Sequence, residues 1–172
     1  MTKSIQHFGV MLVWMCLPML ATSAQVENRD IKSALIYNFA VYTTWPAQES
    51  NVLNVCAFQE DQDNINYHLL EEKKINDKKI TYKTIDGIEE IKNCQVLYLE
   101  ETHWIKDKRL KENIEKYSVL TIADTGNQSA YASMINLQLE NKKYSFTINN
   151  QVAKEASLTL SSKLLRLATR VY

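Results

Sequence analysis

The chain has 172 residues, with 20 basic and 20 acidic side chains and a formal charge of zero. This balance excludes the basic stripe that a nucleic-acid-binding surface needs, so no nucleic acid is expected as a partner. Of the three glycines, only Gly87 and Gly126 follow the amino-terminal segment. Neither a dinucleotide fingerprint nor a phosphate loop can be built from them.

The first 24 residues have the pattern of a secretory signal peptide. Lys3 supplies a positive charge, an apolar run extends from Phe8 to Leu20, and small residues follow at 22–24. The apolar run is too short to cross a bilayer as a helix. We therefore expect a signal peptide over residues 1–24 and one domain over residues 25–172.

The first segment of that domain should be an amphipathic helix. Asn28 or Asp30 is expected to cap it near Ile31, and apolar residues then recur at spacings of three and four. Pro46 is expected to end it. The aromatic side chains of this stripe are interpreted as core, with a ligand role for Tyr37, Tyr42 or Trp45 as the alternative.

Short runs of β-forming residues alternate with helical segments through the middle of the chain. This order favours right-handed βαβ units and a largely parallel sheet. The run at 79–85 alternates with lysines and should lie nearer an edge, whereas the others should be buried. The expected strands are 51–58, 79–85, 94–99 and 118–123.

Acidic side chains follow two of these strands. Asp124 ends the run SVLTIAD at the sheet edge where open α/β folds commonly bind ligands. We interpret Asp124 as a residue that ends the strand. The weaker alternative is that it acts as the acid or base of a hydrolase. Glu100, Glu101 and His103 resemble a metal or acid/base cluster, but no second cluster completes it. They are interpreted as a solvated loop, and no metal or other cofactor is expected.

The end of the chain has a different pattern. Two alternating runs, 134–139 and 143–148, predict a β-hairpin. A short helix capped by Asn149 or Asn150 should follow. A second helix over 159–170 should bury the stripe Leu160, Leu164, Leu167 and Val171. The fold class is therefore α/β: a single three-layer domain, with a mostly parallel central sheet, an antiparallel hairpin near the carboxyl end and flanking helices.

Two cysteines remain after residue 24, Cys56 and Cys94. Secretion and their positions on strands expected to be neighbours favour a disulfide, and two buried free thiols are the alternative. No catalytic motif accompanies them, since no serine lies in a GxSxG elbow and no histidine has a zinc-binding partner at motif spacing. We expect no enzyme.

Three blocks together resemble the YfiR family, whose members carry a DUF4154-type domain. They are IKSALIYNFAVYTTWP at 31–46, CQVLYL with VLTIAD at 94–99 and 119–124, and YSFTINNQVAKEASLTLSSKLLRLA at 144–168. The resemblance implies a periplasmic regulator that binds the periplasmic part of a membrane-bound diguanylate cyclase and represses it. Cys56 and Cys94 match one family cysteine pair, and redox state is one suggested input. The family residues expected at the partner are Phe146, Asn149, Ser161, Ser162 and Leu164.

Some positions depart from the family pattern. The second family cysteine pair is absent, Ala132 and Ser133 replace a pair of glycines, Thr147 replaces an acidic residue, and Ser157 replaces a glycine. These departures bear on the identity of the partner. The leading hypothesis requires an exposed apolar and uncharged patch on the hairpin and the last helices. A sensor of a small ligand or cell-wall fragment, binding near Asp124, Tyr42 and Trp45, is the alternative, and a homodimer is left open.

Overall fold

The computed structural model describes residues 21–47, 50–100, 108–124 and 133–172. Its described part contains an eight-stranded sheet with the order β10-β8-β7-β6-β5-β2-β4-β3. The strands are β2 (Val52–Phe58), β3 (Lys74–Ile75), β4 (Lys78–Ile85), β5 (Val96–Leu99), β6 (Leu120–Ala123), β7 (Ile135–Glu140), β8 (Lys143–Ile148) and β10 (Arg170–Val171). A separate two-stranded pair joins β1 (Thr43–Thr44) to β9 (Thr159–Leu160).

The sheet is mostly parallel, as expected. Strands β4, β2, β5, β6 and β7 run parallel to one another in that order. At the two ends, β3 pairs antiparallel with β4 and β8 pairs antiparallel with β7, and β10 then pairs parallel with β8. All residues of β5 and β6 are buried, which is typical of strands covered on both faces. The half-exposed strand β4 lies next to the edge strand β3, so its predicted position is confirmed.

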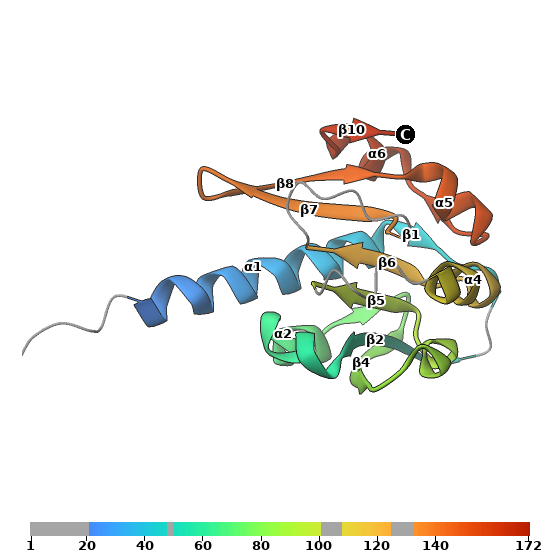
Figure 1. The fold of residues 1–172 in the computed structure, drawn as a ribbon, viewed down its shortest axis with the longest axis horizontal. Helices are drawn as coiled ribbons and strands as arrows, with labels where there is room; N and C mark the ends of the chain where they lie inside the picture. Colours follow the sequence, from blue (N-terminus) through green and yellow to red (C-terminus); the bar gives the residue numbers. More distant parts are fainter. Residues whose placement is uncertain (1–20, 48–49, 101–107, 125–132) are drawn as a thin grey trace, which may run out of the picture.

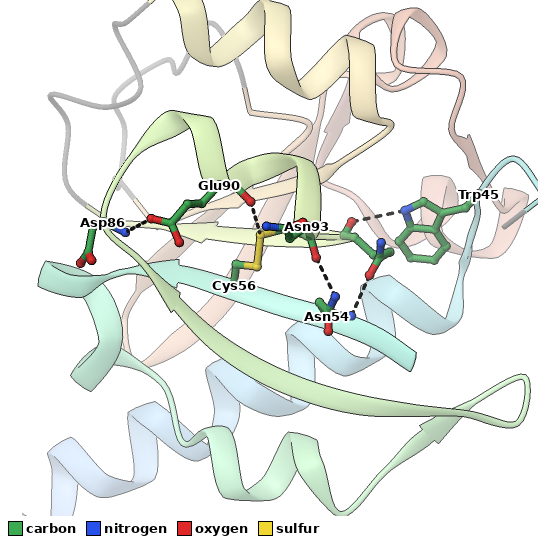
Figure 2. The surroundings of a disulfide bond; sticks show 8 residues. Trp45, Asn54, Cys56, Asp86, Glu90 and Asn93 are labelled. Carbon is green, nitrogen blue, oxygen red and sulfur yellow. Dashed lines mark hydrogen bonds between the residues drawn. A yellow bond between two sulfur atoms is a disulfide. The ribbon is translucent and has the colours of Figure 1, made fainter. Parts of the chain in front are cut away.

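Helices cover both faces of this sheet. Helix α1 packs with α2 on one face, and α4 packs with the short helix η2 on the other; Figure 2 shows the two groups on opposite sides of β2. The α-helices are α1 (Ala21–Val41), α2 (Tyr67–Glu71), α4 (Lys108–Tyr117), α5 (Asn150–Glu155) and α6 (Ser162–Leu167), and the 3-10 helices are η1 (Gln59–Asn64) and η2 (Ile88–Asn93). The fold is therefore the three-layer α/β arrangement predicted from the sequence (Figure 1).

Helix α1 differs from its prediction at both ends. It begins at Ala21, so Asn28 and Asp30 lie inside it and cap nothing. Asp30 instead accepts a hydrogen bond from the Asn66 side chain at 2.7 Å. The helix ends at Val41, before Pro46, because Thr43 and the next residue pair with β9. A tertiary strand pairing thus ends the helix earlier than proline would.

The hairpin is confirmed in its register. Strands β7 and β8 pair Ile135 with Ile148 and Leu137 with Phe146, so the predicted apolar residues share one face. The turn residues Asn141 and Lys142 have φ values of 50° and 62°, the left-handed backbone that two-residue hairpin turns require. Figure 1 shows the hairpin extending beyond the neighbouring strand β6.

The predicted helix over 159–170 is wrong in extent. The segment divides into β9, the six-residue α6 and β10, because β9 pairs with β1 and β10 pairs with β8. Two of the four residues in the predicted core stripe are buried, and the other two are not. Leu160 and Leu164 are buried, whereas Leu167 and Val171 are exposed.

Candidate functional site

The disulfide between Cys56 and Cys94 is present. Their Cα atoms are 5.9 Å apart, and both residues are fully buried within the described chain. The bond joins β2 to the residue two positions before β5, and these two strands are neighbours in the sheet. The predicted pairing across adjacent strands is confirmed.

A polar network extends from the disulfide to Trp45 (Figure 2). The backbone N–H of Asn54 donates to Gln95 Oε1 at 2.8 Å, and the Asn54 amide donates to Asn93 O at 2.6 Å. Trp45 Nε1 donates to the backbone carbonyl of Gln95 at 3.3 Å. Gln95 therefore connects the chain before β2 with the strand that carries Cys56.

Asp124 lies at the carboxyl end of β6, as expected, and its backbone N–H donates to Leu99 O at 2.8 Å. Its side chain forms an ion pair with Lys32 of α1, with Nζ and Oδ2 2.7 Å apart. Glu100 lies 3.4 Å from the same ammonium. Lys32 is only 8% exposed, so this ion pair joins α1 to the carboxyl edge of the sheet.

The neighbours of Lys32 determine its protonation. Burial alone would lower the pKa of Lys32, but the hydrogen bond and charge of Asp124, with the charge of Glu100, outweigh burial and raise it. Burial and the nearby carboxylates also raise the pKa of Tyr98 well above its usual value. The Tyr98 hydroxyl donates to Glu100 Oε2 at 2.9 Å. Asp124 thus pairs with an ammonium group that is charged at neutral pH, an arrangement that supports the structural interpretation of this residue.

Asp61 is the member of this edge that sequence reasoning missed. It is fully buried, and its Oδ2 accepts the backbone N–H of Glu100 at 3.0 Å. It stands in the polar run 59–64, where nothing in the pattern separates it from solvated neighbours. Among the expected cluster residues, Glu101 and His103 lie outside the described residues. In the part of the chain that the structure describes, no three acidic, His or Cys residues are placed to hold a metal ion.

The five family residues expected at a partner lie together near the carboxyl end, in different environments. Phe146 on β8 is half-buried, with its ring edge against Phe39 at a centroid distance of 4.9 Å. Asn149 caps α5 by accepting the Val152 N–H at 3.1 Å. As a group they therefore come from β8, the start of α5 and the start of α6.

The remaining three family residues belong to one turn of chain. Ser161 caps α6 by accepting the Leu164 N–H at 3.2 Å. Ser162 is exposed, whereas Leu164 is 1% exposed and packs in the core. Of these three, Ser162 is the most exposed. Ser161 and Leu164 hold α6 in place, the first through its cap and the second through core packing. Their contact with a partner stays a prediction.

Exposed apolar side chains lie in the same carboxy-terminal segment. Leu167 is 67% exposed and Tyr172 is 58% exposed, and both belong to the segment that forms the outer edge of the sheet through β10. Val171 is exposed as well. We call Ser162, Leu167, Val171 and Tyr172 the carboxy-terminal surface. Figure 1 places α6 and β10 at the end of the molecule farthest from β4.

A cavity of about 270 Å³ lies at the opposite edge of the parallel strands from Asp124. Its walls include Trp45, Val52 at the start of β2, and Gln95 just before β5. A ligand role for Trp45, the alternative to its interpretation as core, stays a prediction. Trp45 lies at the amino ends of the strands and Asp124 at the carboxyl end of β6, so the two residues do not line one site. Sequence patterns do not reveal the cavity because its walls come from separate turns.

No helix in the described ranges has the length and apolar character that a membrane span requires. No curated protein matches the chain significantly. Among solved structures, the ABC domain in complex with L-Trp from Streptococcus pneumonia is 11% identical, with a TM-score of 0.43 over 71% of this chain and 56% of that chain. A conserved domain protein from Vibrio cholerae O1 biovar El Tor is 13% identical, with a TM-score of 0.41 over 71% and 55%.

The chain thus spans little more than half the length of these two structures, and likenesses this distant carry no argument about function. The family comparison is much more extensive. The model of the YfiR/HmsC-like family matches residues 29–169. That range includes α1 from Arg29 onward, the disulfide and all five family residues near the carboxyl end. The chain therefore belongs to the YfiR/HmsC-like family.

Proposed function

We propose that the protein is a non-catalytic periplasmic regulator that binds the periplasmic sensor region of an inner-membrane diguanylate cyclase and represses it. Repression would lower cyclic-di-GMP in the cytoplasm. The observation that carries this proposal is the family match over residues 29–169. The amino-terminal pattern of a signal peptide agrees with it.

Family membership supports both the location and the kind of activity. The YfiR family is periplasmic, and its domain is regulatory rather than catalytic. The family is also associated with binding the periplasmic domain of a membrane diguanylate cyclase. Repression by protein contact requires an accessible surface more than a reactive centre.

The carboxy-terminal surface offers such a contact. Leu167 and Tyr172 are large apolar side chains that remain mostly exposed, and protein interfaces are enriched in aromatic and apolar residues at their centres. Ser162, an uncharged polar residue of the same segment, is exposed as well. Thr147 is buried on β8 between Asn136 and Arg170, so the position that is often acidic in relatives offers little contact here.

The test compares two exposed apolar residues in cells that also carry the cyclase. Leu167→Asp should weaken co-purification with the periplasmic sensor region at least tenfold and raise cyclic-di-GMP, because a charge at an interface centre is strongly unfavourable. Val26→Asp is the matched control, since Val26 is exposed on α1, far from the carboxy-terminal surface in the chain. Unchanged cyclic-di-GMP after deletion of the gene would refute the proposed function.

A second copy of the chain could occupy the same surface. Light scattering on the purified domain distinguishes this case. A dimer that Leu167→Asp converts to monomer, with cyclic-di-GMP unchanged, would assign the surface to self-association and not to the cyclase.

A further inference from the structure

We propose that Gln25 becomes the amino-terminal residue of the exported protein and that its side chain then closes onto its own α-amine. The product is a pyroglutamate lactam, which removes the positive charge from the start of α1. This inference rests on the export that forms part of the proposed function. It does not depend on the diguanylate cyclase or on the carboxy-terminal surface.

The residues before Gln25 set the new terminus. The apolar run from Phe8 to Leu20 is followed by small residues at 22–24, the pattern at which a signal peptide is removed. Cleavage after Ala24 leaves a glutamine first. The side-chain amide of a terminal glutamine lies within reach of its own α-amine, because closing the two groups gives a five-membered ring. The residue type at position 25 therefore permits the modification.

The structure leaves this terminus free to react. Helix α1 begins at Ala21 and continues across the cleavage site, and Gln25 is exposed. In the described part of the chain, the first side-chain hydrogen bond from α1 to a distant residue is that of Arg29 Nη2 to Ile65 O at 3.2 Å. Residues 25–28 come before this contact. Ring closure at the new terminus therefore breaks no contact between α1 and the rest of the described chain.

The reaction balances within residue 25. The unprotonated α-amine attacks the side-chain carbonyl carbon Cδ, so that an N–Cδ bond forms and the Cδ–Nε2 bond breaks. Nε2 takes up the proton that the amine loses and leaves as ammonia, with no change in oxidation state and no co-reactant. An α-amino group ordinarily has a pKa of about 7.7–8.0, so its unprotonated form is present near neutral pH. The ring contains only atoms of residue 25, so the backbone of α1 does not have to move.

Cyclisation changes the charge at the start of α1. A free terminus would place an ammonium group at the positive end of the helix dipole, which is unfavourable. The lactam is neutral. The exposed Glu27, in the first turn of the shortened helix, then supplies the negative charge that this end of a helix favours. The modified terminus should therefore stabilise the first turn, and it lacks the free amine that an aminopeptidase requires.

Mass spectrometry of the exported protein tests the modification. The full chain is expressed with its amino-terminal segment, purified from the periplasm and digested with trypsin. The first peptide should be QVENR, because Arg29 is the first basic residue after position 24, and it should be lighter by about 17 Da, the mass of ammonia. A labelled synthetic QVENR peptide, added before digestion, measures cyclisation during handling. A different first residue, or a cyclised fraction no larger than that of the labelled peptide, would overturn the inference.

Two substitutions locate the reaction. Gln25→Met, similar in size but without an amide, should be cleaved after Ala24, show no loss of ammonia and leave a terminus that an aminopeptidase digests. Gln151→Met is the matched control. Gln151 is also exposed, but its backbone nitrogen belongs to a peptide bond, so the loss of ammonia from the first peptide should be unchanged. A loss of ammonia that persists in Gln25→Met would assign the modification to another residue.

Hydrogen exchange tests the effect on α1. In an α-helix the N–H of Arg29 bonds the carbonyl of residue 25, so its exchange reports on the first turn. Exchange at Arg29 should be about two- to fivefold faster in Gln25→Met than in the wild type, as expected for one unfavourable charge at a helix end. Exchange at the buried Leu110 of α4 should not change. Equal exchange at Arg29 in the two proteins would overturn the stabilising effect. None of these readouts involves cyclic-di-GMP, so their failure is distinguishable from failure of the proposed function.

Discussion

The two halves of the sheet differ in how completely their apolar side chains are buried. The half formed by β2, β5 and β6 buries nearly all of them and is crossed by the Cys56–Cys94 disulfide. The half formed by β8, β10 and α6 leaves Leu167, Val171 and Tyr172 exposed. One half is braced by a disulfide, and the other carries the carboxy-terminal surface that we propose for contact with a partner. In this proposal the residues that stabilise the fold and those that contact the partner lie at different ends of one domain.

The largest effect should come from removing the brace. Replacing both cysteines, Cys56→Ser and Cys94→Ser, should lower the free energy of unfolding by about 4 kcal/mol, because the bridge closes a loop with a sequence separation of 38. Urea unfolding measures the change. A reductant should destabilise the wild type by a similar amount and leave the double variant unaffected. A loss below about 1 kcal/mol would contradict the assigned role of the bond.

The ion pair between α1 and the sheet should come next. Asp124→Asn should cost about 3 kcal/mol, because it leaves the buried Lys32 ammonium with only the more distant Glu100. Glu155→Gln is the matched control, since it removes a carboxylate from the exposed ammonium of Lys111 and should change stability little. Equal effects of the two substitutions in urea unfolding would show that burial does not strengthen the Lys32 pair.

High pH should weaken the same region. The raised pKa of Lys32 and the raised pKa of Tyr98 both mean that the folded state holds these protons more tightly than the unfolded chain. Their contribution is fully present below their ordinary values of 10.5 and 10.0 and is lost as pH rises further.

Urea titrations between pH 8 and pH 11.5 measure this loss. Tyr98→Phe should make the alkaline decline shallower and cost about 1 kcal/mol at neutral pH, because it removes the hydrogen bond to Glu100. Tyr172→Phe, at an exposed tyrosine, is the control. A decline of unchanged steepness in Tyr98→Phe would assign the alkaline sensitivity to other groups.

Adjacent serines in the contact half allow a sharper comparison. Ser161→Ala should cost about 1 kcal/mol, because it removes the cap of α6. Ser162→Ala should leave stability unchanged, since Ser162 is exposed. Thermal melts measure both variants, and Ser161→Asn should restore the lost stability. If Ser162→Ala raises cyclic-di-GMP while the protein stays fully folded, Ser162 acts through contact with the partner.

The smallest effect should be a gain. Ser157 has a φ of 60°, the left-handed region in which glycine carries no steric cost. Ser157→Gly should therefore raise the free energy of unfolding by about 0.5 kcal/mol. A loss of stability in thermal melts would mean that the Ser157 side chain contributes more than its backbone strain costs.

The strands were predicted more accurately from the sequence than the segment 159–170. A run of apolar β-forming residues placed β2, and patterns with a period of two placed β4 and the hairpin, because each of these strands buries one or both faces. The segment 159–170 has helical spacing, but its first residues pair with β1 and its last residue pairs with β8. Pairings between distant strands leave no periodic signal in the segment itself, so local reasoning extended the helix too far.

The features of the candidate site also differ in whether the sequence predicts them. The disulfide followed from strand adjacency, and the Asn149 cap was recognised from residue type. The Ser161 cap was missed, because Ser161 was placed inside a helix over 159–170. The Lys32–Asp124 pair could not be predicted, because residue 32 reads as the polar side of an amphipathic helix. The same holds for the cavity, whose walls Trp45, Val52 and Gln95 meet only after the sheet has formed.

The pairings of α1 have a consequence for the order of folding. Lys32 needs Asp124, and Thr43 in β1 needs Leu160 in β9, so the first helix finds its last partners near the end of the chain. A polypeptide that emerges with its amino end first can pack α1 against α2 early, but α1 gains its last partners only when nearly the whole chain has emerged. Contacts this distant in sequence slow folding. During that interval Phe39 of α1 lacks its ring contact with Phe146.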